Sequence, residues 1–435
     1  MLDIRFVRDN ATRVKEFSAQ KGYEVDVDAV LQLDEERREL QQKADELRAR
    51  RNDISAQMKN GKPEQSLIDE GKVLKTTLAE VEERFKVIDQ EFTTALKRIP
   101  NAPLADVPLG TREEDNQVVK TVGEIPQFAF TPKNHAEIAT KNGWLDKERA
   151  AKVAGSRFAY IKGDLVKLQF ALIQFVIDKL SAQEFIDEVI AENKLSVSSK
   201  VFTPILPPLM LRTELYDAMD RLEPRDDRYK IEDEDLWLQG SAEHVLGSMH
   251  ADEVFDEQDL PVRYIGYATS FRREAGTYGK DMEGMFRMHQ FDKLEMESLT
   301  TGEAGHDEHL FLVAIQEKIM QLLGIPYHLL LKSTFDIGKP NARGVDLEAW
   351  LPAQQKYRET HTADYMTDYQ SRRLKMRVRR TNGSLELVHT NDATGLPLSR
   401  GPIAIIENYQ QADGSVVIPE VLQAYMGGRK ILKSA

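Results

Sequence analysis

Cysteine is absent from all 435 residues of the sequence, so disulfide bonds, thiolate zinc sites and cysteine nucleophiles are excluded. No window approaches the ~20 apolar residues that a membrane-spanning helix needs. The N-terminal segment MLDIRFVRDN also lacks the apolar run of a signal peptide. We therefore expect a cytoplasmic protein without a membrane segment.

Acidic residues outnumber basic ones, 72 to 59. The net charge of -13 argues against a protein that coats nucleic acid non-specifically, although it leaves room for a local basic patch. The apolar share of 41% and the charged share of 30% are typical of a globular protein. A chain of this length has room for two to three domains, each with its own core.

Common nucleotide-binding and metal-binding motifs are missing or incomplete. Gly279-Lys280 is followed by Asp281, where a P-loop needs a hydroxyl residue. No Gly-x-Gly-x-x-Gly opens a helix, so a Rossmann fold has no support. The HDEH segment at 306–309 could suggest a metal site, but it lacks a plausible third ligand, and we interpret it as the polar, exposed start of a helix.

Two segments near the N-terminus show the apolar spacing of a coiled coil. The first runs from Leu33 to Met58 and the second from Leu74 to Ala95, with a turn around KNGKPEQ between them. Two such helices should fold back into an antiparallel hairpin. Each arm of about 30 residues would be roughly 45 Å long, which predicts a projecting arm rather than part of a small core.

The outer part of this arm is basic in an acidic protein. Between residues 43 and 62 it has three acidic side chains and six cationic ones. The cationic residues are Lys43, Arg48, Arg50, Arg51, Lys59 and Lys62. Such charge runs usually form the solvated face of a coiled coil. The alternative hypothesis is an electrostatic grip on a nucleic-acid backbone, and the charge pattern alone leaves both open.

The segment IPNAPLADVPLG at 99–110 contains three prolines and a glycine, which indicates a linker. We place a domain boundary there, with a first domain at 1–105 and a second at 106–435. Beyond the linker, helical patterns such as LVKLQFALIQFVIDKL alternate with strand-like ones such as PVRYIGYATSF. Several strands meet at turns rather than at crossover helices, which predicts an α+β domain with a largely antiparallel sheet.

The most informative stretch is FRREAGTYGKDMEGMFRMHQFDKLEM at 271–296. Reading its last twelve residues as a strand puts two sets on opposite faces. One set is charged and aromatic: Arg287, His289, Phe291, Lys293 and Glu295. The other is mainly apolar: Phe286, Met288, Gln290, Leu294 and Met296. The charged face could simply be exposed to solvent, but an aromatic between cations also suits a nucleotide base and its phosphates.

This stretch resembles motif 2 of the class II aminoacyl-tRNA synthetases, in the form found in the seryl-tRNA synthetase family. Further segments fall in that family's order and spacing: GSRF, DEQDLP, DLEAWLPAQQKYRE, DYQSRR, VHT, IIENYQ and DGSVVIPEVL. The resemblance covers essentially the whole chain. It implies a six- to seven-stranded antiparallel sheet flanked by helices, and a homodimer built around motif 1, where PILPPLML stands.

The resemblance implies an ATP site and a division of roles. Arg272 would hold the ATP α-phosphate and the serine carboxylate. Glu274 would accept from the adenine amino group, and Phe291 would stack on adenine. Arg400 would bind the γ-phosphate at the start of a helix.

The resemblance also implies a metal site and an adenylate-forming step that needs no general base. Glu359 and Thr362 would hold Mg²⁺. Arg272, Arg400 and Glu359 are thus the expected catalytic residues. A serine carboxylate is already ionised at neutral pH, so its attack on the α-phosphorus needs positioning and charge neutralisation rather than a general base.

An amino-acid pocket is implied next to the ATP site. Ser241 and Glu243 of GSAEH match the family's Thr-x-Glu element, and Glu295 would hold the serine ammonium. Thr394 matches the hydroxyl near the serine side chain. Asp392 stands where the family usually has asparagine, and an ionised carboxylate can only accept hydrogen bonds.

The implied activity is that of a serine–tRNA ligase, which makes seryl-adenylate from L-serine and ATP and transfers the seryl group to the 3' end of tRNA(Ser). Whether tRNA(Sec) is also a substrate stays open. One alternative is a synthetase paralogue that loads a small amino acid onto a carrier protein or another acceptor. Another is a non-catalytic RNA-binding or coiled-coil scaffold. The retained arm favours the ligase over the first, and the retained site residues favour it over the second.

Overall fold

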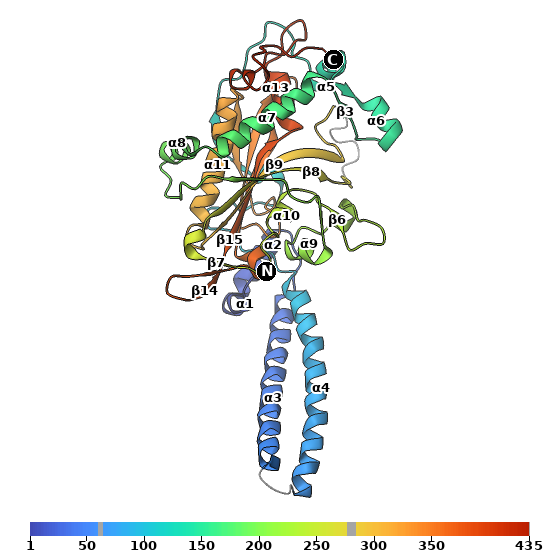
Figure 1. Cartoon of the computed structure of the whole chain (residues 1–435), viewed down its shortest axis with the longest axis vertical. Coiled ribbons are helices and arrows are strands. Elements are labelled where there is room, and N and C mark those ends of the chain that lie inside the picture. Colours follow the sequence, from blue (N-terminus) through green and yellow to red (C-terminus); the bar gives the residue numbers. More distant parts are fainter. Residues whose placement is uncertain (60–63, 276–283, 435) are drawn as a thin grey trace. The chain divides into compact units, whose positions relative to one another are not determined.

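The computed structural model describes residues 1–59, 64–275 and 284–434. The chain forms two compact units, Met1–Ala102 and Pro103–Ala435 (Figure 1). Two earlier expectations fall on residues that are not described: the basic residue Lys62 of the arm and the Gly279-Lys280 pair. No helix in the described ranges has the length and apolar character needed to cross a membrane.

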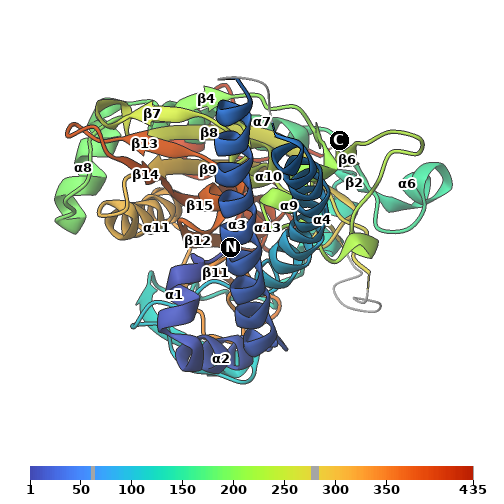
Figure 2. The ribbon, with the colours of Figure 1, turned by 90° about the horizontal axis from the view of Figure 1, so that it is seen from below.

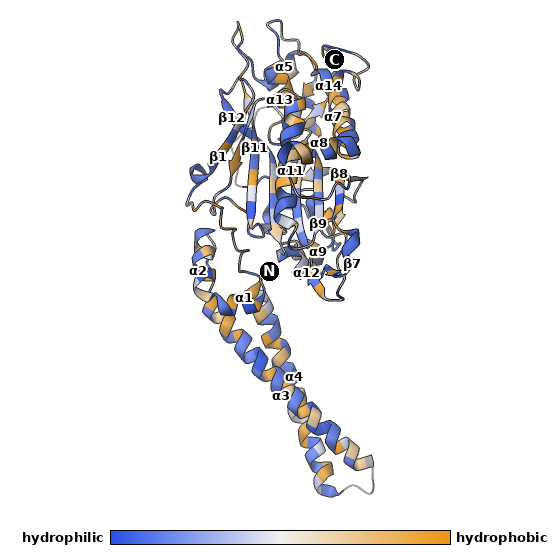
Figure 3. Cartoon of the chain, turned by 90° about the vertical axis from the view of Figure 1, so that its left-hand side faces the viewer, coloured by the Kyte–Doolittle hydropathy of each residue, from blue (hydrophilic) through white to orange (hydrophobic). Residues whose placement is uncertain are grey.

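The first unit consists of helices, in the order α1 (Ile4–Asp9), α2 (Ala11–Gln20), α3 (Val27–Lys59) and α4 (Gln65–Leu96). The long helices α3 and α4 lie antiparallel, as the heptad spacing predicts (Figure 1). Ala44, Leu78 and Val81 are buried between them. Figure 3 shows mainly hydrophilic residues along both helices, with apolar residues interspersed. The prediction of a coiled-coil hairpin is confirmed.

A polar cluster lies where the heptad pattern contains charged residues. The guanidinium of Arg37 lies 4.6 Å from the centre of the Phe92 ring, so its planar face covers an apolar side chain. Asp34 is fully buried and forms ion pairs with Arg37 at 3.3 Å and with Arg8 of α1 at 3.1 Å. These contacts explain how an arginine can occupy a core step of the hairpin.

The second unit is built on one eight-stranded sheet. Its strands, in spatial order, are β1 (Gln117–Val122), β10 (Tyr327–Leu331), β11 (Arg343–Leu351), β12 (Lys356–Thr367), β15 (His389–Pro397), β9 (Gln290–Thr300), β8 (Val262–Phe271) and β4 (Thr203–Ile205). Figure 2 shows the strands from β8 to β11 side by side in that order. All neighbours pair antiparallel except β4 and β8. The α+β class is confirmed, and the described sheet has more strands than the six to seven expected.

Helices pack on the sheet and bury its apolar face. They include α7 (Asp164–Leu180), α11 (Gly305–Leu322) and α13 (Arg400–Asn408), and α8 (Gln183–Asn193) packs against α7 and α11. Shorter helices are α5 (His135–Lys141), α6 (Lys147–Ala154), α9 (Thr213–Ala218), α10 (Glu243–Leu246), α12 (Tyr369–Leu374) and α14 (Glu420–Gln423), with 3₁₀ turns at Glu113–Asp115, Arg225–Asp227 and Glu257–Asp259. Small strands are β2 (Leu145–Asp146), β3 (Tyr160–Ile161), β5 (Met210–Leu211), β6 (Trp237–Leu238), β7 (Val254–Asp256), β13 (Arg377–Arg379) and β14 (Leu385–Leu387).

The expectation that the HDEH segment is exposed is wrong for its second half. Glu308 and His309 are buried at the start of α11. Glu308 accepts from Arg263 of β8 at 2.6 Å and from Ser298 of β9 at 2.7 Å. These bonds compensate for burying the carboxylate, and they tie the helix to two strands.

Candidate active site

A cavity of about 130 Å³ lies on the face of β9 that carries Phe291 and Lys293. It brings together seven predicted site residues from four separate segments: Arg272, Glu274, Phe291, Glu359, Thr362, Thr394 and Arg400. The opposite face of β9, with Leu294 and Met296, joins the hydrophobic core. The alternation predicted for this strand therefore holds from Gln290 onward. Its charged face, however, is largely buried and does not form an open, solvent-facing surface.

The strand begins later than predicted, and this changes part of the cavity wall. Residues 285–289 are not in β9, which begins at Gln290. Period-two alternation does not apply to them, so the expectation that Phe286 and Met288 face away from Arg287 is wrong. All three side chains line the cavity.

The adenine end of the expected ATP site is marked by ionic and aromatic contacts. Arg272 follows β8, and its Nε donates to the Gly240 carbonyl at 2.9 Å. Its guanidinium carbon lies 5.3 Å from the centre of the Phe291 ring. Glu274 accepts from Arg287 at 2.8 Å. An aromatic face, a carboxylate and a cation thus lie together, which is the combination that a purine nucleotide needs.

The opposite wall holds an ion pair between two predicted catalytic residues. Nη1 of Arg400 lies 2.9 Å from Oε1 of Glu359. Partial burial of the Glu359 carboxylate in the cavity wall would raise its pKa, but the positive charges of Arg400 and Lys332 outweigh this effect and lower the pKa to about 2. Glu359 is therefore a carboxylate at neutral pH. Phe286 lies against both Arg358, at 4.1 Å, and Arg400, at 4.7 Å from the ring centre.

The predicted magnesium ligands offer oxygen donors. The Glu359 side chain is half exposed, and the Thr362 hydroxyl lies beside the Asp346 carboxylate. Asp346 lies directly opposite Thr362 on β11. Carboxylate and hydroxyl oxygens suit Mg²⁺, which takes its other ligands from phosphates and water. The described part of the chain contains no group of three or more His, Cys, Asp or Glu side chains placed to hold a metal ion.

The expected ammonium-binding residue, Glu295, is fully buried beside the cavity. It lies 2.5 Å from Lys293 on the same strand face. Burial, opposed by Lys293 and reinforced by the nearby charge of Glu243, raises the pKa of Glu295 to about 7. Arrival of a substrate ammonium would favour the ionised form of Glu295.

A glutamine that the sequence did not single out sets the positions of the two predicted threonines. Nε2 of Gln316, on α11, donates to the carbonyls of Thr362 at 2.8 Å and Thr394 at 2.9 Å. The residue is fully buried. This pair of bonds fixes β12 and β15 at the level of the cavity, and nothing in the helical pattern around Gln316 predicts it.

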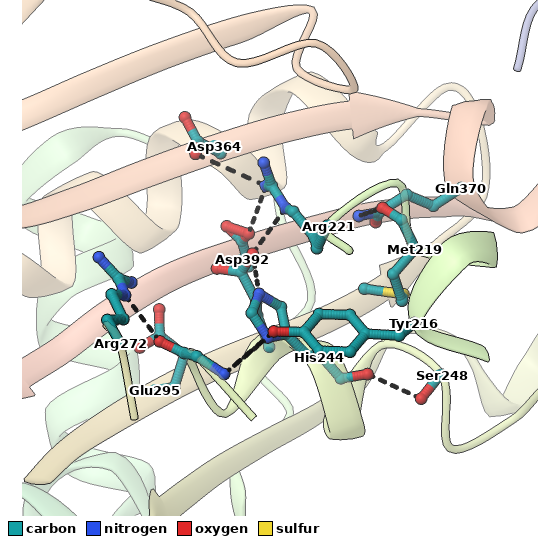
Figure 4. Close-up of polar contacts among 12 residues, drawn as sticks. Tyr216, Met219, Arg221, His244, Ser248, Arg272, Glu295, Asp364, Gln370 and Asp392 are labelled. Carbon is teal, nitrogen blue, oxygen red and sulfur yellow. Dashed lines mark hydrogen bonds and ion pairs between the residues drawn. The ribbon is translucent and has the colours of Figure 1, made fainter. Parts of the chain in front are cut away.

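The predicted Ser241 and Glu243 lie at the start of α10 and are buried. Glu243 forms an ion pair with Arg221, whose Nε lies 2.7 Å from the carboxylate, and His244 lies 3.5 Å from the same carboxylate. Burial lowers the pKa of His244 to about 4, so its ring is neutral at pH 7. The sequence did not indicate a role for Arg221, because this residue lies in an irregular segment without any motif. Figure 4 shows it between Asp364 and Asp392.

The predicted basic residues of the arm belong to the first unit, where some form ion pairs and others are exposed to solvent. Arg48 and Arg50 form ion pairs across the hairpin, with Glu82 at 2.8 Å and Glu70 at 2.7 Å. Lys43 and Arg51 are exposed. Lys59 is the last residue of α3, and its side chain is not described. Of the four predicted side chains that the structure describes, two thus help to hold the hairpin together.

Comparisons with known proteins agree with this geometry. Residues 1–103 match the Seryl-tRNA synthetase N-terminal domain, and residues 228–409 match the tRNA synthetase class II core domain (G, H, P, S and T). The chain is 39% identical to a serine–tRNA ligase of Dictyoglomus turgidum over 435 residues, with 98% of each chain covered.

Comparison with solved structures leads to the same family. The fold is similar to that of the seryl-tRNA synthetase from Pyrococcus horikoshii complexed with ATP, with a TM-score of 0.89, 35% identity and 100% of both chains covered. It is also similar to the cytoplasmic serine-tRNA ligase from Naegleria fowleri in complex with AMP, with a TM-score of 0.85, 30% identity, and 100% and 99% covered. The chain belongs to the seryl-tRNA synthetase family of class II aminoacyl-tRNA synthetases.

Proposed function

We propose that this protein is a cytoplasmic serine–tRNA ligase. It joins L-serine to ATP, giving seryl-adenylate and pyrophosphate, and transfers the seryl group to the terminal adenosine of tRNA(Ser). The observation that carries this proposal is the meeting of Arg272, Phe291, Glu359 and Arg400 in one cavity. The full-length similarity to serine–tRNA ligases includes the N-terminal hairpin and supports tRNA as the acceptor rather than a carrier protein.

The first step depends on charge placement. Arg272 neutralises the α-phosphate and holds the serine carboxylate beside it, so that the carboxylate oxygen attacks as the bond to pyrophosphate breaks. Arg400 binds the γ-phosphate end of the nucleotide, and Phe291 stacks on the base. Arg400 forms an ion pair with Glu359, which places the γ-phosphate site next to the proposed metal site.

Magnesium would be held by Glu359 and Thr362 together with the phosphates. When bound, it neutralises phosphate charge that the arginines do not reach. Serine would bind next to the α-phosphate, with its ammonium on Glu295 and its side chain toward Thr394, Ser241 and Glu243.

Amino-acid-dependent ATP–pyrophosphate exchange tests the proposed function. We expect exchange with L-serine, and at least about tenfold lower kcat/KM with threonine, alanine or glycine, because a polar pocket discriminates against side chains that leave its groups unpaired. Charging of tRNA(Ser) transcripts then tests the second step, with tRNA(Sec) as a further acceptor. Absence of serine-dependent exchange would refute the proposal.

A homodimer is part of the proposal. In the PILPPLML segment, Leu206 is 79% exposed, and Leu209 and Met210 are also exposed apolar residues. They follow β4, which is an edge strand of the large sheet. Neighbouring exposed apolar side chains at a sheet edge favour a protein interface.

Leu206→Glu is expected to convert the dimer to a monomer, because a buried, unpaired charge at the interface costs several kcal/mol. Size-exclusion chromatography with light scattering measures the mass. Val153→Glu provides a matched control, since Val153 is 73% exposed on α6, far from this segment in sequence. A Leu206→Glu protein that stays dimeric would place the interface elsewhere.

A further inference from the structure

Three carboxylates lie in a row across neighbouring strands, next to the predicted serine pocket. Asp364 on β12 lies directly opposite Asp392 on β15, and Asp392 lies directly opposite Glu297 on β9. All three are buried, with at most 7% of each residue exposed. Glu297 comes two residues after Glu295, so it shares the strand face of the predicted ammonium site.

The guanidinium of Arg221 lies near two carboxylates of this row, and the charge of Lys332 also acts on Asp364. Nη2 of Arg221 lies 3.6 Å from Asp392 and 3.9 Å from Asp364, while Nε lies 2.7 Å from Glu243 (Figure 4). Nη2 also donates to the Asn341 side-chain oxygen at 3.2 Å. Neither carboxylate oxygen of Asp392 accepts a hydrogen bond from a described residue. Arg221 thus binds Glu243 closely and approaches Asp392 more loosely.

The facing charges determine where protons reside. Asp392 faces Asp364 from β12, Glu297 from β9, Glu243 from α10, and Arg221 from the segment after α9. Burial and the neighbouring carboxylates raise the pKa of Asp392 well above its ordinary value, against the opposing charge of Arg221. Glu243 behaves in the opposite way, because Arg221 overcomes its burial and lowers its pKa well below the usual range.

We propose that Arg221 and Asp392 form the specificity-determining pair of the amino-acid pocket. Arg221 holds Glu243 as the ionised acid, and Asp392 carries a proton and donates a hydrogen bond to the side-chain hydroxyl of the substrate. The inference rests on the proposed function, since it assigns the residues that recognise the serine side chain. Arg221 acts as a positioning residue through Glu243 and Asp392.

This assignment explains how an aspartate can stand at the asparagine position of the family. A protonated carboxyl has one O–H donor and one carbonyl acceptor, as an amide has an N–H donor and a carbonyl acceptor. An ionised Asp392 would instead place another negative charge beside Asp364, Glu297 and Glu243, with Arg221 as the opposing cation, which a buried site disfavours strongly. A pocket with three ionised carboxylates would suit an amino acid with a cationic side chain rather than serine.

The pH dependence of serine binding tests the proton on Asp392. The O–H donor is present below the folded-state pKa of Asp392 and is lost as the pH rises through it. We therefore expect the serine KM of the wild-type enzyme in pyrophosphate exchange to rise with pH relative to that of Asp392→Asn, by about tenfold once Asp392 has lost its proton, with little change in the ATP KM. Serine's own amino group titrates equally in both enzymes and cancels in the comparison.

Further variants distinguish recognition from packing. Asp392→Ala should raise the serine KM at least tenfold at every pH, and Arg221→Met should do the same, while Arg221→Lys should recover part of the loss. Glu386→Gln, which neutralises an exposed acid, serves as the charge-matched control. Thermal unfolding monitors folding, and the Asp392 variants carry the test if Arg221→Met is unstable.

Two results would overturn the inference, and they are distinguishable from failure of the proposed function. Parallel serine pH profiles for the wild type and Asp392→Asn would show that no proton on Asp392 is used. Preferential activation of 2,3-diaminopropionate over serine would mean that the row is ionised and binds a cation. Failure of the proposed function would instead appear as no serine-dependent exchange by the wild-type enzyme.

Discussion

Arg272→Ala is expected to lower serine-dependent ATP–pyrophosphate exchange by at least about 10³-fold, because it removes the cation that neutralises charge developing on the α-phosphate. The side chain is well placed for that role. Its Nε is anchored on the Gly240 carbonyl at 2.9 Å, and the residue lines the cavity beside Phe291. Exchange and single-turnover adenylate formation both measure the loss, which should fall mainly on the chemical step.

The adjacent arginine provides a matched control. Arg273 contacts the Tyr229 ring, 5.9 Å from its centre, and does not line the described cavity. Arg273→Ala should therefore keep exchange within about threefold of wild type. Arg272→Lys should recover only part of the activity, since an ammonium keeps the charge but loses the planar, two-pronged geometry. Equal losses in the two alanine variants would show that the motif has been misplaced.

The sequence predicts this part of the site well because its signals are local. Residues after Gln290 alternate between core and cavity as a strand requires, and the heptad spacing gives both long helices of the hairpin. The prediction is wrong where local regularity ends, at Phe286 and Met288, since both precede the strand and face the cavity with Arg287. Periodicity identifies a face only for residues that are in the regular element.

The amino-acid end of the pocket was less predictable because its contacts are long-range. Arg221 and Asp392 are 171 positions apart in the sequence, and only strand register brings Asp392 between Asp364 and Glu297. Asp392 alone looks like an unfavourable replacement of asparagine. The structure adds its counter-ion and its neighbours, and with them a reason why this aspartate can be neutral. Such compensation depends on pairings that no single segment contains.

A shortened N-terminal hairpin is expected to separate the two steps of the reaction. Replacing residues 43–81 with a short Gly/Ser linker should lower tRNA charging at least about 100-fold, because contacts with the nucleic-acid backbone supply much of the binding free energy. Serine-dependent exchange should stay within about threefold. The remaining base keeps the Glu36–Arg84 ion pair at 2.7 Å and the Arg37–Phe92 contact at 4.6 Å, so the helices retain a packed end.

A finer variant tests charge within the intact hairpin. Lys43→Glu with Arg51→Glu should raise the tRNA KM at least tenfold and weaken its salt dependence, because neither side chain is used in an ion pair of the described hairpin. Arg48 and Arg50 are unsuitable here, since their pairs with Glu82 and Glu70 also stabilise the hairpin. Equal loss of exchange and charging in the shortened protein would assign the hairpin a structural role. Unchanged charging in both variants would mean that tRNA is bound elsewhere.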